Sequence, residues 1–186
     1  MSLRERQEAQ EVLRRAGVNT WVVLLRAVNV GGTGKLPMVE LRALCEAAGF
    51  GAVRTYIASG NVVLRGASTE KQVKAALEER LQAHVGKPVG VLVRSATEMA
   101  AVLAANPFPQ AAPNRNVVVF LDAAPPADAL TAVSHRNGEE IALGKREIHI
   151  HYGEGMAGSK LRIPAAKDGT ARNMNTVARL VEMAAD

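Results

Sequence analysis

The sequence predicts an α+β protein built as a tandem duplication of a ferredoxin-like β-α-β-β-α motif with antiparallel or mixed sheets. Two observations carry this prediction. Residues 20–94 alternate short β-branched segments with amphipathic helical segments in the order β-α-β-β-α-β, which is the order of a split βαβ unit. Residues 95–186 repeat most of that order. Glycine or proline stands at several of the boundaries between segments, as expected where a chain turns.

In the first half, the apolar run 21–28 has the hydrophobicity of a buried central strand, and apolar residues at helical spacing predict a helix over 37–48. Two strands, 53–58 and 61–65, follow around a tight turn. Ser68 begins a second helix that ends near Gly86, and residues 89–94 form the last strand of this half.

The second half begins with a predicted helix over 96–105 and a proline-rich loop. A strand over 117–122, a helix over 127–134, a hairpin of strands 139–143 and 147–152, and a helix over 171–184 follow. We therefore expect a helical extension over residues 1–19, with its helix at 3–15, and two α+β repeats, 20–94 and 95–186, packed on each other.

Composition excludes several classes of protein. With 48% hydrophobic and 22% charged residues, the chain is neither disordered nor low in complexity, and the single Cys45 excludes an internal disulfide. No apolar run is long enough to span a bilayer and no signal peptide is apparent, so we expect a cytoplasmic protein without a membrane partner. Residues 1–94 carry 14 Lys and Arg against 8 Asp and Glu, which favours an anionic partner.

A glycine-rich loop follows the first strand. Residues 31–35 read Gly-Gly-Thr-Gly-Lys, and such a loop before a helix can bring backbone N–H groups to a phosphate. Asn29 and Leu36 stand where a Walker A motif requires Gly and Ser or Thr, which disfavours a standard NTPase. An anion-binding loop and a purely structural loop both remain open. Arg26, a charge within the apolar run, must reach an edge, a carboxylate or a ligand.

A second basic motif lies near the C-terminus. Lys160 belongs to a stretch in which basic residues outnumber acidic ones, and Thr170 is the predicted N-cap of the last helix. That cap places Arg172 and Asn173 in the first helical turn, where a cation opposes the helix dipole. An anionic ligand would compensate for this, and so would a carboxylate from the first half of the chain.

Two further polar motifs have a structural interpretation. Ser59 and Asn61 flank Gly60 and most simply form the hairpin turn, with ligand contact as the alternative. Residues 147–151 read Glu-Ile-His-Ile-His, which places three polar side chains on one face of a strand. A solvated sheet face is favoured over a metal site, because a metal would need a third ligand position from elsewhere. We predict no metal and no cofactor.

Several segments together resemble one bacterial family, the domain-of-unknown-function 1697 (DUF1697) family. They are Leu25–Gly32, Lys35–Met38, Arg54–Val63, Asn106–Phe108, Ser159–Leu161 and Thr170–Thr176. The chain differs from the family's usual pattern in having Ala27 in place of Gly and Met174 in place of Trp. The resemblance implies a duplicated α+β fold and a cytoplasmic bacterial protein, and it implies no particular activity.

The leading functional hypothesis is a module that binds a phosphate-bearing or other anionic small ligand. The alternatives are an enzyme that acts on a nucleotide or a phosphorylated metabolite, and an RNA- or DNA-binding module. The residues predicted to contact the ligand are Arg26, Asn29, Gly31, Gly32, Lys35, Ser59, Asn61, Lys160, Arg172 and Asn173.

Overall fold

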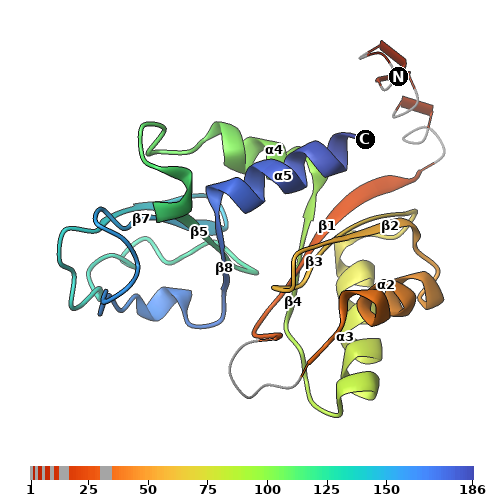
Figure 1. Cartoon of the computed structure of the whole chain (residues 1–186), viewed down its shortest axis with the longest axis horizontal. Coiled ribbons are helices and arrows are strands. Elements are labelled where there is room, and N and C mark those ends of the chain that lie inside the picture. The colour runs from red at the N-terminus through yellow and green to blue at the C-terminus, as the bar shows by residue number, and fades with distance from the viewer. Residues whose placement is uncertain (1, 3, 6, 9–10, 13–16, 30–34) are drawn as a thin grey trace. The chain divides into compact units, whose positions relative to one another are not determined.

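A computed structural model describes residues 2, 4–5, 7–8, 11–12, 17–29 and 35–186 of the 186-residue chain (Figure 1). It contains two four-stranded antiparallel sheets and four α-helices, α2 to α5, within these residues. The chain divides into two compact units, Met1–Met99 with Leu180–Asp186, and Ala100–Arg179. The helix predicted over 3–15 lies mostly outside the described residues.

The first unit holds a sheet with the strand order β2-β3-β1-β4. Its strands are β1 (Asn19–Leu25), β2 (Gly51–Tyr56), β3 (Asn61–Gly66) and β4 (Val91–Ser95). β1 lies at the centre and pairs antiparallel with both β3 and β4. This position explains its nearly continuous run of apolar residues, because a central strand covered on both faces has no side for polar side chains.

Two helices, α2 (Met38–Ala47) and α3 (Glu70–Val85), lie on one face of this sheet (Figure 1). Leu41 and Cys45 of α2 and Leu77 and Leu81 of α3 pack with alternate residues of the strands in one buried cluster. α3 begins with a capping box between Thr69 and Gln72, as a well-defined helix start requires. The predicted elements of this half are therefore confirmed, with the first strand ending earlier than expected.

The second unit holds a sheet with the order β6-β7-β5-β8. Its strands are β5 (Asn116–Phe120), β6 (Glu140–Leu143), β7 (Glu147–His151) and β8 (Thr170–Asn173), and all their pairings are antiparallel. The hairpin of β6 and β7 agrees with the prediction, and it turns where Gly144 donates its N–H to the carbonyl of Glu147 at 2.8 Å.

One predicted helix of this half, over residues 127–134, is wrong. Residues 127–132 form turns instead, and Leu130, the largest apolar side chain there, is 41% exposed, so the segment buries little apolar surface that would stabilise a helix. The face of Ile148 and Ile150 is covered instead by the segment 161–166, which contains the short 3₁₀ helix η2 (Pro164–Ala166). A second 3₁₀ turn, η1 (Pro113–Arg115), precedes β5.

The C-terminal basic motif begins as a strand and not as a helix. Residues 170–173 form β8, and α5 (Met174–Ala185) starts only after them. Asn173 fills the role predicted for Thr170, since its Oδ1 accepts a hydrogen bond from the N–H of Thr176 at 3.0 Å. Arg172 therefore does not sit in a helical turn, and the predicted conflict with the helix dipole does not arise. In the same way, α4 (Ala96–Ala104) begins at the residue directly after the end of β4, just as α5 begins directly after β8.

α5 ends on the first unit's edge strand. Arg54 of β2 donates through Nη2 to the carbonyl of Met183, and its Nη1 lies 3.6 Å from the carboxylate of Asp186. A cation at this end satisfies carbonyl groups that have no partner inside the helix. None of the described helices is both long and apolar enough to cross a membrane.

Two of the three polar residues of β7, Glu147 and His149, are buried, and His151 is half-buried, which corrects the expectation of a solvated face. Glu147 is 5% exposed and His149 is 3% exposed, and Nδ1 of His149 finds no hydrogen-bond partner within the described residues. Burial lowers the pKa of His149, while the neighbouring Glu147 opposes this shift. The described residues hold no group of three or more His, Cys, Asp or Glu side chains that could bind a metal.

Substitution of Gly60 tests the packing at the end of the central strand. Gly60 has a φ of +82°, and an added Cβ would lie 2.7 Å from Cγ2 of Val28 and 2.8 Å from Cβ of Leu25. We expect Gly60→Ala to lower the free energy of unfolding, measured in urea, by more than the ~1 kcal/mol cost of the left-handed conformation alone. Gly86→Ala is the matched control, because Gly86 has a φ of +80° and open space around it. Equal losses in the two variants would contradict the close packing.

A pH titration of stability tests the burial of His149. Its folded-state pKa lies below the unfolded value of about 6.5, so protonation favours the unfolded chain. The contribution of the neutral His149 imidazole to the free energy of unfolding is fully present above about pH 6.5 and is lost as the pH falls toward the folded-state pKa. We expect His149→Phe to flatten the change in urea midpoint between pH 7.5 and 5.5. His135→Asn, at an exposed position, should leave that change as in the wild type.

Candidate functional site

A basic cavity of about 650 Å³ opens in the first unit. Its walls come from the residues after β1, the last turn of α3, and the segment that leads into β4. In Figure 1 these are the end of β1 beside the grey trace, the lower end of α3 and the start of β4. The volume falls within the range of small-molecule sites in proteins.

Two glycines allow the chain to form this cavity. The N–H of Leu25 donates to the carbonyl of Gly60 at 2.8 Å, and the N–H of Arg26 donates to the carbonyl of Gly90 at 2.9 Å. A Cβ at position 90 would lie 3.1 Å from Cβ of Arg26, so glycine lets the arginine stem lie against the start of the neighbouring strand. Arg26 thereby leaves the sheet as a half-buried side chain in the cavity wall.

Positive charge dominates the lining of the cavity. Arg26, Lys35 and Lys87 come from three separate segments, and His84 adds an imidazole. The described lining residues include no carboxylate, so that set carries a net positive charge. The rest of the wall is largely apolar, and Leu36 is its most deeply buried side chain. Such a cavity favours an anion, because charge-assisted hydrogen bonds to Lys and Arg are stronger than neutral ones.

His84 connects the cavity to the first turn of α2. Its Nε2 lies 2.9 Å from Oε2 of Glu40, and both side chains are partly exposed. This contact joins the C-terminal end of α3 to the N-terminal end of α2, where an acid is favourable. Glu40 itself does not line the cavity.

Asn29 fastens the base of the glycine-rich loop. Its Nδ2 donates to the carbonyls of Leu36 and Ala58 at 2.9 and 2.8 Å, and its Oδ1 accepts the N–H of Leu36 at 2.6 Å. Asn29 and Ala27 both have a φ of +54°, a region that suits Asn and Gly better than Ala. The side-chain amide of Asn29 therefore closes the loop. The ligand contact expected for Asn29 stays a prediction. Gly31 and Gly32 lie outside the described residues.

The turn between β2 and β3 has the structural role favoured from the sequence. Asn61 is fully buried, and its Nδ2 donates to the carbonyl of Tyr56 at 2.9 Å and to Oγ of Ser59 at 3.0 Å. Two donors of the amide thus hold the turn, and neither Asn61 nor Ser59 lines the basic cavity. Their contact with a ligand stays a prediction.

The predicted C-terminal site residues lie in the second unit. Arg172 is 6% exposed, and its Nη1 donates to Oγ1 of Thr170 and to the carbonyl of Ala171, both at 2.8 Å. Burial lowers the pKa of its guanidinium to about 10, which leaves it charged at neutral pH. Asn173 caps α5, as described above, and Lys160 is exposed at a different cavity.

Two residues of the basic cavity escaped the sequence analysis. His84 and Lys87 belong to the segment His84–Pro88 (His-Val-Gly-Lys-Pro), in which α3 ends. From the sequence, this segment predicted only the end of a helix. The available signal was a cation placed directly between a C-cap glycine and a proline. Because its partners Arg26 and Lys35 are more than fifty residues away in the chain, spacing alone does not associate them.

Removal of the Asn29 amide tests its structural role. Asn29→Ala leaves the N–H of Leu36 and two carbonyls without their partner, and it puts alanine at a positive φ. We expect the free energy of unfolding to fall by about 1–3 kcal/mol, measured in urea. Asn175→Ala, at an exposed position of α5, should change it little. A stable Asn29→Ala variant would contradict the closing role.

Comparisons with known proteins agree with this fold. A conserved bacterial protein, SP0830 from Streptococcus pneumoniae, has a solved structure that matches with a TM-score of 0.75 and 23% sequence identity, over 90% of this chain and 99% of that chain. At this identity the likeness establishes the fold alone. The search of curated proteins returned no match. The family model described as "Protein of unknown function (DUF1697)" matches residues 18–149, which is well over half of the chain. The resemblance found in the sequence motifs is thereby confirmed, and the chain belongs to the DUF1697 family.

Proposed function

We propose that the first unit binds a phosphate-bearing small ligand in the basic cavity. The observation that carries the proposal is the convergence of Arg26, Lys35 and Lys87 on one cavity whose described lining residues include no carboxylate. Cations from separate segments can contact several oxygens of one phosphate group at once. The apolar part of the wall leaves room for the body of the ligand beside that group.

A purely structural explanation accounts for only part of this arrangement. His84 and Lys87 stand at the C-terminal end of α3, where cations are favourable with or without a ligand. Arg26 and Lys35 belong to no helix end of that kind, and Arg26 leaves an otherwise apolar strand. Gly31 and Gly32 stay predicted donors to the same ligand. The proposal does not require Lys160, Arg172 or Asn173.

We also infer that the chain is a duplication of one ferredoxin-like motif. The two sheets have the same strand order when β5 to β8 replace β1 to β4. In each sheet a buried arginine of the last strand pairs with a valine of the central strand, Arg94 with Val22 and Arg172 with Val118. Shared order and register support a common origin, with the second copy having lost two helices.

Calorimetric titration with inorganic phosphate, adenosine monophosphate and glucose 6-phosphate tests the proposed site. We expect saturable binding to the wild type by at least one of the three. Lys35→Ala and Lys87→Ala should each weaken it about tenfold or more, which corresponds to ~1.4 kcal/mol per lost contact. Lys71→Ala, which removes an exposed cation of α3 away from the cavity, is the matched control and should bind as the wild type.

Three results would decide against this site. Equal weakening in all variants, including Lys71→Ala, would indicate general attraction to a basic surface. Tight, strongly salt-dependent binding of RNA oligomers without small-ligand binding would favour the nucleic-acid alternative. No binding of any probe by a folded protein would remove the proposed function. Turnover of a bound probe would instead promote the enzyme alternative, with the same site.

A further inference from the structure

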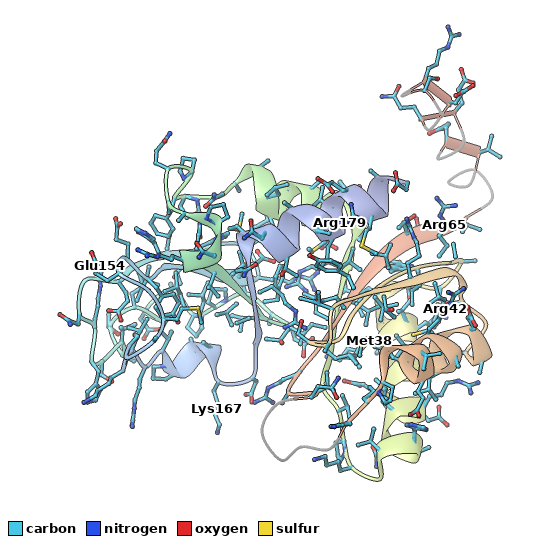
Figure 2. All side chains as sticks on the ribbon, viewed as in Figure 1. Met38, Arg42, Arg65, Glu154, Lys167 and Arg179 are labelled. Carbon is cyan, nitrogen blue, oxygen red and sulfur yellow. The ribbon has the colours of Figure 1, made fainter. Side chains whose placement is uncertain are left out.

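The second unit contains a separate cavity of about 740 Å³. Three short segments form its walls: residues 135–139 before β6, residues 152–155 after β7, and residues 157–160. Figure 2 labels Glu154, one of the lining residues. All residues of these segments are described, and the cavity does not depend on the first unit or on its proposed ligand.

The lining differs in chemistry from that of the basic cavity. Arg136 and Lys160 are balanced by Glu139 and Glu154, so neither an anion nor a cation is favoured overall. The largest aliphatic side chain among the lining residues is that of Ala157, so an apolar ligand finds little surface to cover. The remaining lining groups are mostly glycines, amides and hydroxyls, which suit a ligand that both donates and accepts hydrogen bonds.

Hydrogen bonds hold one buried carboxylate, that of Glu139, in place in the wall of this cavity. Glu139 is 4% exposed, and its Oε1 and Oε2 accept hydrogen bonds from Oγ of Ser159 and from the N–H of Asn137. Nε of Arg136 holds the backbone carbonyl of Glu139 at 2.6 Å. The hydrogen bond from Ser159 is the main cause that lowers the pKa of Glu139, so the group is ionised at neutral pH. A carboxylate oxygen can accept more than one hydrogen bond, so Glu139 can also accept from a ligand.

Tyr152 adds a ring and a hydroxyl to the same wall. It is half-buried, and burial, followed by the charge of Glu139, raises the pKa of its phenol. The hydroxyl is therefore protonated at neutral pH and can both donate and accept. Its ring packs in part against the apolar cluster that contains Ile148 and Ile150, and the remaining surface of Tyr152 lines the cavity. Gly138, Gly155 and Gly158 have positive φ and open space where a Cβ would stand, which leaves the backbone of these turns accessible.

We propose that this cavity binds a neutral polyhydroxylated ligand of the sugar class. Adjacent hydroxyls of a sugar ring donate to the fixed carboxylate of Glu139, and the C–H face of the ring lies on Tyr152. Arg136 and Lys160 are then donors to ring oxygens, because Glu139 and Glu154 balance their charges and leave no net attraction for a phosphate. The balance of charges and the lack of aliphatic surface select this class over anionic, cationic and apolar ligands.

Saturation-transfer NMR on the full chain with D-glucose, D-galactose, D-mannose and D-ribose tests this proposal. We expect saturable transfer to at least one sugar, with a millimolar Kd typical of a weak single-ring ligand. Tyr152→Ala should reduce the affinity at least fivefold, and Glu139→Gln should abolish measurable binding. Glu154→Gln keeps the shape of the wall and serves if Glu139→Gln does not fold. The Glu154→Gln variant should then bind the neutral sugar more weakly and glucose 6-phosphate more tightly than the wild type does.

Three outcomes separate this proposal from its competitors. Saturable binding that is lost in Tyr152→Ala and kept in Lys87→Ala supports a sugar site in the second unit, whatever becomes of the basic cavity. Absence of saturable transfer from the folded protein to any of the four sugars overturns it. Binding of glucose 6-phosphate alone, unaffected by Tyr152→Ala and abolished by Lys87→Ala, also overturns it and assigns the sugar to the first unit's cavity.

Discussion

The end of the central strand β1 is held between two glycines, and the first unit's cavity depends on this arrangement. Backbone hydrogen bonds from Leu25 to Gly60 and from Arg26 to Gly90 fix the strand end from both sides. Both neighbouring strands must approach closely, and side chains at positions 60 or 90 would crowd the chain there. The chain then leaves the sheet with Arg26 in the cavity wall. A strand end fixed in this way gives a basic side chain a defined position without a helix to support it.

Both sheets end in the same way, with a strand that leads directly into a helix. Ser95 ends β4, and its Oγ accepts the N–H of Glu98 at the start of α4. Asn173 ends β8 and accepts the N–H of Thr176 at the start of α5. A short polar side chain at such a junction satisfies a first-turn donor while the backbone is still extended. The proposed duplication would account for the same chemistry at corresponding positions.

The sequence predicted the first half of the fold well and the second half only in part. Periodic apolar residues predicted the helices of the first unit, and the start predicted at Ser68 differs by one residue from the observed N-cap, Thr69. In the second unit the same rules failed at residues 127–132 and at β8. β8 has only four residues, and Arg172 is buried there, which local hydrophobicity does not reveal. The segment is extended because it pairs with β5, which lies about fifty residues earlier in the chain, so no local pattern reveals the pairing.

The sequence by itself determined the family, the α+β class and the presence of Arg26 and Lys35 beside a glycine-rich loop, because motifs and periodicity are local properties. Tertiary structure decided which backbone groups the polar side chains contact and which distant residues line one cavity. Asn29, Asn61 and Asn173 satisfy backbone groups, while Lys87 joins the cavity from a distant segment. A hydrogen bond or a cavity wall forms between residues that only folding brings together, so no pattern along the chain identifies it.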